Sequence, residues 1–278
     1  MLRSRLRLPG RRRAVLGLVV VAGVAFAACV PIAPPPPPGQ YVGLGFDTCA
    51  APSASTMSAW LSSPYRSIGV YIGGENAACL GGNLTRSWVS TVTNSGWKLA
   101  PLYVGLQAPC NTEFNVMDTD PAGAFFQGLA AAVKAGGEAG GLGLGAGTPI
   151  YLDMESYSCG GYASAGSQAV MNFTNGWVIE LHALGYLAGY YSSAATGIAD
   201  QVTNVQNGGP FHYPDAVWFA HWNNSATANT DSYIPDSFWV NSRLHQYLGS
   251  GQVQPSQDTF GGVQLNIDLD FDNGPLAG

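Results

Sequence analysis

The chain has 278 residues, of which 46% are hydrophobic and only 10% charged, and its formal net charge is −6 at pH 7. Six of its eleven basic residues lie within the first 13 positions, which leaves five basic against seventeen acidic residues, a net charge of −12, for the rest. This acidic surface excludes nucleic acid as a partner, and few charges with many tyrosines and tryptophans are typical of exported proteins that bind sugars.

The first 28 residues have the layout of an export signal. Three arginines at 11–13 precede an apolar run that is too short to span a membrane as a mature helix. With the residues that follow them, these arginines resemble a twin-arginine signal. We therefore expect residues 1–28 to be removed on export, the proline-rich 29–40 to form an extended spacer, and 41–278 to fold as one monomeric domain.

Short β-type runs alternate with helix-like stretches along this domain, which is typical of a parallel sheet with crossover helices. Eight strands are predicted, at 41–47, 67–72, 98–104, 148–153, 186–191, 216–220, 244–248 and 264–270. Helices are predicted between the first six strands, at 55–61, 85–94, 121–135, 163–184 and 194–205. The pattern predicts a (β/α)8 barrel of TIM type, with some outer helices missing or reduced after strands 6 and 7. The alternative, a doubly wound open sheet, would need a glycine fingerprint that the sequence lacks.

The five cysteines leave one without a partner in the chain. An ordinary A-x-A cleavage site at 25–27 would release the protein outside the cell, whereas a lipobox ending at Cys29 would anchor it by a lipid to the outer face of the cytoplasmic membrane. Both interpretations stay open. The other four can form two disulfides in an exported protein: Cys49, Cys79, Cys110 and Cys159. They follow strands one to four, so Cys49–Cys79 and Cys110–Cys159 are geometrically compatible pairs among three connectivities.

Two carboxylates follow the fourth predicted strand. Asp153 and Glu155 stand at i and i+2, so they project from the same face of the strand and each alters the other's proton affinity. In TIM-type barrels the active site lies at the carboxyl ends of the strands. Glycosidic-bond cleavage needs such a pair, with one carboxyl held protonated and the other ionised.

Other strand ends supply further candidates for the same rim. Asp47 ends the first strand, Glu75 follows the second, and Asp268 and Asp270 belong to the eighth. Carboxylate clusters can also hold calcium, but the chain has no EF-hand spacing and no His/Cys zinc pattern, so we expect no metal and no cofactor. The chain also lacks the G-x-S-x-G elbow of serine hydrolases.

Aromatic residues lie beside these strand ends. Tyr191, Trp222 and Tyr247 are candidates for substrate binding, since aromatic rings at a barrel mouth stack on sugars. For Tyr191 and Trp222, a place in the core is equally compatible with the sequence, and for Trp218 we expect the core.

Four motifs, in their order along the chain, resemble the actinobacterial exported glycoside-hydrolase-like domains, whose function is largely undefined. They are Gly45-Phe46-Asp47-Thr48-Cys49, Tyr71-Ile72-Gly73-Gly74, Tyr151-Leu152-Asp153-Met154-Glu155 and Ile267-Asp268-Leu269-Asp270. The chain is more distantly similar to the family 25 muramidases, which cleave peptidoglycan on a barrel that lacks some outer helices. The resemblance implies that Asp47, Asp153, Glu155 and Asp268 are the catalytic acids and that Glu155 is the general acid. Two positions depart from the muramidase pattern, the Gly73-Gly74-Glu75 turn and Asp270, where asparagine is more usual.

The leading hypothesis is therefore an exported glycoside hydrolase that acts on a cell-envelope glycan such as peptidoglycan. The alternative is a catalytically inactive or weakly active glycan-binding lipoprotein on the same fold, and a third hypothesis is a calcium-stabilised structural domain. In the first two hypotheses the residues expected to contact the glycan are Glu75, Tyr191, Trp222, Tyr247 and Asp270.

Overall fold

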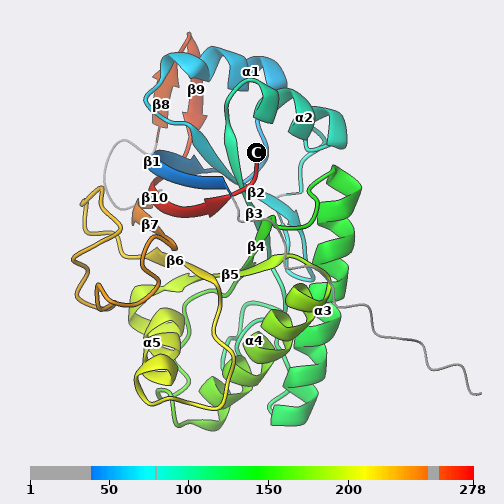
Figure 1. Ribbon diagram of the computed structural model, residues 1–278, viewed down its shortest axis with the longest axis vertical. Coiled ribbons are helices and arrows are strands. Elements are labelled where there is room, and N and C mark those ends of the chain that lie inside the picture. Colours follow the sequence, from blue (N-terminus) through cyan, green and yellow to red (C-terminus); the bar gives the residue numbers. More distant parts are fainter. Residues whose placement is uncertain (1–38, 79, 250–256) are drawn as a thin grey trace, which may run out of the picture. The chain divides into compact units, whose positions relative to one another are not determined.

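The computed structural model describes residues 39–78, 80–249 and 257–278. Eight strands close into a barrel in the order β1, β10, β7, β6, β5, β4, β3, β2 (Figure 1), which confirms the predicted TIM-type α/β architecture. The barrel strands are β1 (Gly39–Asp47), β2 (Ser67–Gly73), β3 (Lys98–Tyr103), β4 (Pro149–Asp153), β5 (Leu187–Ser193), β6 (Ala216–Ala220), β7 (Arg243–Leu248) and β10 (Asp268–Leu276). Strand β1 begins two residues before the expected start of the domain at residue 41.

The last barrel strand differs from its prediction. The expected strand at 264–270 is split between β9 (Val263–Asn266), which pairs with β8 (Gln257–Phe260) in a hairpin outside the barrel, and β10. Strand β10 runs antiparallel to both of its neighbours, β1 and β7. Because it is reversed, its beginning and not its end lies at the rim where the parallel strands finish. Asp268 is thereby paired with Asp47 across the ladder.

Helices cover the barrel between the first six strands, as predicted. They are α1 (Ala54–Ala59) with the 3-10 turn η1 (Trp60–Ser62), α2 (Arg86–Asn94), α3 (Pro121–Leu142), α4 (Ala165–Ala183) and α5 (Ala199–Gln206), which follows the π-helix η2 (Ala194–Ile198). Side chains of Ser53, Thr85, Asp120 and Ser164 cap the first four helices by accepting a backbone N–H of the first turn. In the described residues no helix follows β6 or β7, which confirms the expected reduction of the outer layer.

A long loop, residues 221–242, takes the place of the helix after β6. The guanidinium of Arg243, 1% exposed, anchors this loop from inside. Its Nε donates to the Phe238 carbonyl at 2.9 Å and its Nη1 to the Ala228 carbonyl at 3.2 Å. Buried backbone carbonyls thus find a donor without a helix, and the loop is held against the barrel rim.

Alternation along the strands separates two apolar cores. Ile150 and Leu152 of β4 face the helices, whereas Tyr151 joins Trp218 in the barrel interior, which confirms Trp218 as a core residue. Space in this interior depends on Gly69, because a Cβ there would lie 2.6 Å from the Trp218 ring and 2.7 Å from the Asp47 Cβ. The interior face of β4 ends in Asp153 and therefore leads directly into the rim.

Cys110 and Cys159 form a disulfide with their Cα atoms 5.5 Å apart, which confirms one predicted pair. Cys79 lies outside the described residues, so the predicted Cys49–Cys79 pair does too, as do the predicted signal, Cys29 and all but the last two residues of the spacer. No helix among the described residues is long and apolar enough to cross a membrane.

Candidate functional site

Acidic side chains from three strands converge at the rim where β1 and β4 end and β10 begins. The Tyr71 ring lies among them: burial raises the pKa of its hydroxyl, and the charges of Asp47, Asp153, Glu155 and Asp268 raise it further. Four of the acids that the sequence singled out therefore surround one position. The reversal of β10 brings Asp268 there by a route that the parallel-barrel rule does not foresee.

Burial sets the protonation of this acid cluster. Asp47 is 6% exposed and Asp153 is 2% exposed. Burial, followed by the charge of Asp268, raises the pKa of Asp47 to about 8. Burial also raises the pKa of Asp153 well above its ordinary value, with the charges of Glu155 and Asp47 acting in the same direction, and burial raises the pKa of Glu155. Two interacting, buried carboxyls cannot both ionise without a large electrostatic cost, so the pair retains a proton to higher pH than an exposed pair.

Glu155 and Asp153 differ in their access to open space. Glu155 lines a pocket of about 320 Å³ together with Tyr191, Trp222 and Tyr233. Asp153 lies behind it, and in the described part of the chain its Oδ1 is buried without a hydrogen-bond partner. Glu155 is thus the member of the pair that can reach a bound molecule.

A second, adjoining group of acids lines its own pocket. Asp47, Asp268 and Tyr71 border a space of about 220 Å³. The charge of Asp47 acts on Asp153 as well as on its own neighbours. The Glu155 pocket and the Asp47–Asp268 pocket are therefore linked by Asp153, whose pKa responds to the charges of both Glu155 and Asp47.

Gln246 connects two aromatic side chains of the Glu155 pocket, Tyr191 and Trp222, to the acids. We call these two residues the aromatic wall. Its Nε2 donates to Asp47 Oδ2 at 2.8 Å, and its Oε1 accepts from Tyr191 OH at 3.1 Å and from Trp222 Nε1 at 3.0 Å. These bonds fix the Tyr191 and Trp222 rings beside Glu155, although Trp222 remains 46% exposed. Tyr247, the predicted contact in β7, projects from the other strand face, and burial with the charges of Asp270 and Asp258 raises its pKa to about 12.

Gln107 holds the backbone of the Asp153–Glu155 segment. It is fully buried in the loop after β3, where its Nε2 donates to the Asp153 carbonyl at 2.8 Å and its Oε1 accepts the Glu155 N–H at 2.7 Å. Sequence reasoning missed this residue, because a glutamine outside a motif carries no signal of its buried partners.

Two further acids of β10 point into the barrel below the rim. Asp270 accepts from Trp218 Nε1 at 3.0 Å and is 2% exposed, so it lies beneath the pockets and does not line them. Asp272 accepts a hydrogen bond from Ser67, and burial raises its pKa to about 7 even though that bond lowers it. Asp270 was predicted to contact the glycan, but neither pocket is lined by its side chain.

Glu75 does not join the acid cluster. It forms an ion pair with Lys134 of α3, and Tyr103 OH donates to its Oε2 at 3.3 Å. Burial acts to raise the pKa of Glu75, but the hydrogen bond and charge of Lys134 outweigh it and leave the pKa below its ordinary value. Glu75 is a surface acid with its own partner, outside the acid cluster, and its predicted contact with a glycan stays a prediction.

Several solved structures share this fold at low sequence identity. An uncharacterized protein of B. stearothermophilus is 18% identical with a TM-score of 0.50, over 82% of this chain and 95% of that one. The Mycobacterium tuberculosis Tat-secreted protein Rv2525c, in complex with HEPES, is 16% identical with a TM-score of 0.51, over 86% and 98%. The Clostridium perfringens spore cortex lytic enzyme SleM is 14% identical with a TM-score of 0.50, over 83% and 67%. At these identities the likeness is one of fold alone.

The sequence itself gives the assignment. No curated protein matches this chain. The family described as the Rv2525c-like, glycoside hydrolase-like domain matches residues 58–271, which spans the sequence from α1 into β10 and includes Asp153, Glu155 and Asp268. The chain therefore belongs to the family of Rv2525c-like glycoside hydrolase-like domains.

Proposed function

We propose that this protein is an exported glycoside hydrolase that cleaves a cell-envelope glycan such as peptidoglycan by carboxylate general acid/base chemistry. The observation that carries the proposal is the Asp153–Glu155 pair, in which one carboxyl reaches a pocket and the other is buried behind it. The family supports a role on glycans, and a lytic enzyme that acts on the spore cortex shares the fold.

In the proposed reaction Glu155 donates its proton to the leaving glycosidic oxygen. Asp153 is a positioning residue that keeps a proton on the pair: burial raises the pKa of both carboxyls, and the charge of Glu155 raises that of Asp153 further. Glu155 is the member of the pair through which this proton reaches the pocket. Asp47 and Asp268, in the adjoining pocket, stabilise the positive charge that develops on the sugar ring or activate the attacking water.

The aromatic wall supplies the sugar-binding surface of the proposal. Tyr191 and Trp222 line the Glu155 pocket, and both are oriented by Gln246. A ring held in one orientation presents its face to the C–H face of a pyranose with little loss of side-chain entropy on binding. The exposure of Trp222 favours this role over a place in the core.

Export is part of the same proposal. The arginine-rich, apolar N-terminus supports it, and so does the Cys110–Cys159 disulfide, which persists in oxidising compartments. Lipid anchoring at Cys29 and release after cleavage at 25–27 differ in a measurable way. A Cys29→Ser variant leaves the membrane fraction if Cys29 carries lipid, and it behaves as the wild type if the chain is released.

The test is digestion of purified peptidoglycan. The wild type is expected to release new reducing ends over time, whereas the Asp153→Asn/Glu155→Gln double variant serves as the matched blank. Sedimentation with the same peptidoglycan measures binding independently of turnover. Binding without product after long incubation would reject hydrolysis and leave the glycan-binding protein as the function.

A further inference from the structure

A second, larger pocket adjoins the Glu155 pocket on the outer side of the rim. It encloses about 490 Å³ between the loop that follows Glu155, the π-helix η2 and the first turns of α4 and α5. Ala195 of η2 lines both pockets and forms the ridge between them. Tyr157, only two residues beyond Glu155, lies on its wall. Because the two pockets share Ala195, a polymeric ligand bound in the Glu155 pocket can extend into this second pocket.

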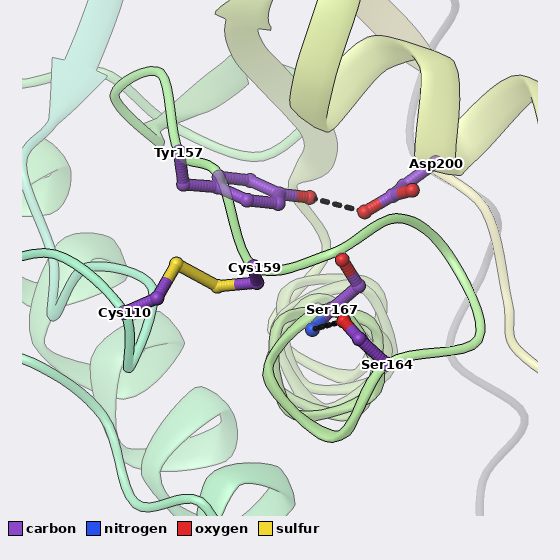
Figure 2. Close-up of a disulfide and its surroundings, with 6 residues drawn as sticks. All are labelled: Cys110, Tyr157, Cys159, Ser164, Ser167 and Asp200. Carbon is purple, nitrogen blue, oxygen red and sulfur yellow. Dashed lines mark hydrogen bonds between the residues drawn. A yellow bond between two sulfur atoms is a disulfide. The ribbon is translucent and has the colours of Figure 1, made fainter.

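Asp200 is the polar centre of this pocket. Its carboxyl accepts a 2.6 Å hydrogen bond from Tyr157 OH and a second one from the Ser167 hydroxyl, which Figure 2 shows directed toward it. Thr196 also lines the pocket, and in the described residues its buried Oγ1 has no hydrogen-bond partner. Buried hydroxyls normally find a partner, so Thr196 favours a ligand that supplies one.

The walls of the pocket are fixed before any ligand binds. The Cys110–Cys159 disulfide pins the loop on one side, and a Cβ at Gly166 would lie 2.7 Å from Cys159 Sγ, so the loop rests directly on the start of α4 (Figure 2). Ser164 caps that helix by accepting the Ser167 N–H at 3.1 Å. These contacts hold the Ser167 hydroxyl, and with it the Asp200 carboxyl, in one place. The π-helix η2 forms another wall, and π-helices are frequent at functional sites.

The lining selects the class of ligand. Asp200 is its one charged residue, and no basic residue is among those that line it. Such a lining disfavours phosphate and carboxylate ligands, because their charge would be buried beside Asp200 without a partner. Serine and threonine hydroxyls, a carboxylate and the rings of Tyr157 and Tyr162 are suited to a neutral molecule with many hydroxyls.

We propose that this pocket is a second sugar subsite, which holds a further unit of a glycan whose neighbouring unit occupies the Glu155 pocket. Sugar hydroxyls pair there with Thr196 Oγ1 and with the Asp200 carboxyl, which Tyr157 and Ser167 hold in place. The inference rests on the proposed function for the nature of the ligand, but binding at this subsite requires no turnover.

The first test measures how affinity depends on glycan length. N-acetylglucosamine oligomers of increasing length are titrated calorimetrically into the Glu155→Gln variant. We expect long oligomers to bind more tightly than short ones, and Ala199→Trp, which fills the pocket from α5, to remove this gain while short oligomers bind as before. Gln206→Trp, on the exposed side of the same helix, is the matched control and keeps the gain. A gain that persists in Ala199→Trp, or the absence of any gain with length, overturns the subsite.

The second test needs no bulky substitution. Ser167→Ala removes the hydrogen bond that holds Asp200 in the pocket, so affinity for long oligomers falls about three- to tenfold while short oligomers bind as before. Thr174→Val removes a buried hydroxyl of α4 that does not line the pocket, and it leaves affinity unchanged. Equal affinities in the Ser167→Ala variant and its parent contradict the role of Ser167.

The two proposals fail separately. If peptidoglycan is not hydrolysed but the length-dependent gain is present and is lost in Ala199→Trp, the subsite holds and the hydrolase proposal is wrong. If peptidoglycan is hydrolysed and Ala199→Trp binds long oligomers as its parent does, only the subsite is rejected.

Discussion

The ends of β2 and β4 each present a carboxylate to solvent, yet the two carboxylates have opposite electrostatics. Glu75, after β2, is paired with Lys134, and its pKa lies below the ordinary value. Glu155, after β4, stands in front of the buried Asp153, and burial raises its pKa. The same position relative to a strand therefore yields an ionised surface acid in one case and a proton-holding acid in the other. The neighbours of a carboxylate, more than its place on the rim, decide whether it can act as a general acid.

Giving Glu155 a cation like that of Glu75 should produce the largest effect. Ser193→Lys places an ammonium group in the same pocket, where it favours the ionised form of Glu155. We expect hydrolysis at neutral pH to fall roughly a hundredfold and the pH optimum to move toward acid, as measured by reducing-end release from pH 4 to 9. Ser193→Met is the uncharged control of similar length. An unchanged pH optimum in Ser193→Lys would show that the pKa of Glu155 does not control the reaction.

Removing the Gln246 amide, which links Asp47 to Tyr191 and Trp222, should have the next largest effect. Gln246→Leu leaves Asp47, Tyr191 and Trp222 without a shared partner. We expect about 2 kcal/mol less stability in denaturant titrations and about tenfold less activity, because unpaired polar groups are costly and the rings lose their orientation. Tyr247→Phe, one residue further and on the other strand face, is the control. Full activity in Gln246→Leu would separate the aromatic wall from the chemistry.

The buried acids below the rim test whether burial alone raises a pKa in this barrel. The pKa of Asp272 is about 7 in the folded chain, above its ordinary value, so its contribution to stability is present at low pH and is lost as pH rises through 7. Asp272→Asn stays neutral, and we expect it to melt on the order of 5 °C above the wild type at pH 9, with a difference that shrinks as pH falls and vanishes below the ordinary pKa of 3.8. Glu113→Gln, on the surface, is the control for removal of one acidic group. Equal wild-type and Asp272→Asn melting temperatures at pH 9 would contradict a buried, protonated Asp272.

Removing the cation beside Glu75 should have the smallest effect. Lys134→Met deletes an ion pair whose lysine is 59% exposed, and such pairs contribute at most about 1 kcal/mol. Because the pKa of Glu75 is lowered, this contribution is present above the ordinary glutamate pKa and is lost as pH falls through the folded value. The wild type and variant should therefore converge in stability at low pH, and hydrolysis should not change. A loss of activity would place Glu75 in the site after all.

Strands and helices followed from local patterns that need no tertiary information. Alternation places Tyr151 and Asp153 on one face of β4, with Glu155 two residues beyond the end of the strand, and the capping residues mark the helix starts. The reversal of β10 could not be predicted in this way, because a period of two is the same in either strand direction. Asp268 was nevertheless expected at the correct rim, since reversal of the strand and splitting of the predicted element compensate, whereas Asp270 lies below the rim.

Contacts between residues distant in sequence account for what the patterns missed. Lys134 is 59 positions from Glu75, and Gln107 is 46 positions from Asp153. Neither partner belongs to a motif, and neither pairing leaves a periodic trace in the chain. The acid cluster was therefore predictable as a set of residues, whereas the partner that excludes Glu75 from it was not.

The most direct measurement compares the two strand-end acids on one substrate. Initial rates of reducing-end release from purified peptidoglycan are measured for the wild type, Glu155→Gln and Glu75→Gln, with melting temperatures to show that all three are folded. We expect a loss of about 10²- to 10⁴-fold for Glu155→Gln and a rate within about twofold of the wild type for Glu75→Gln. Wild-type activity in Glu155→Gln, or an equal loss in both variants, would contradict Glu155 as the general acid.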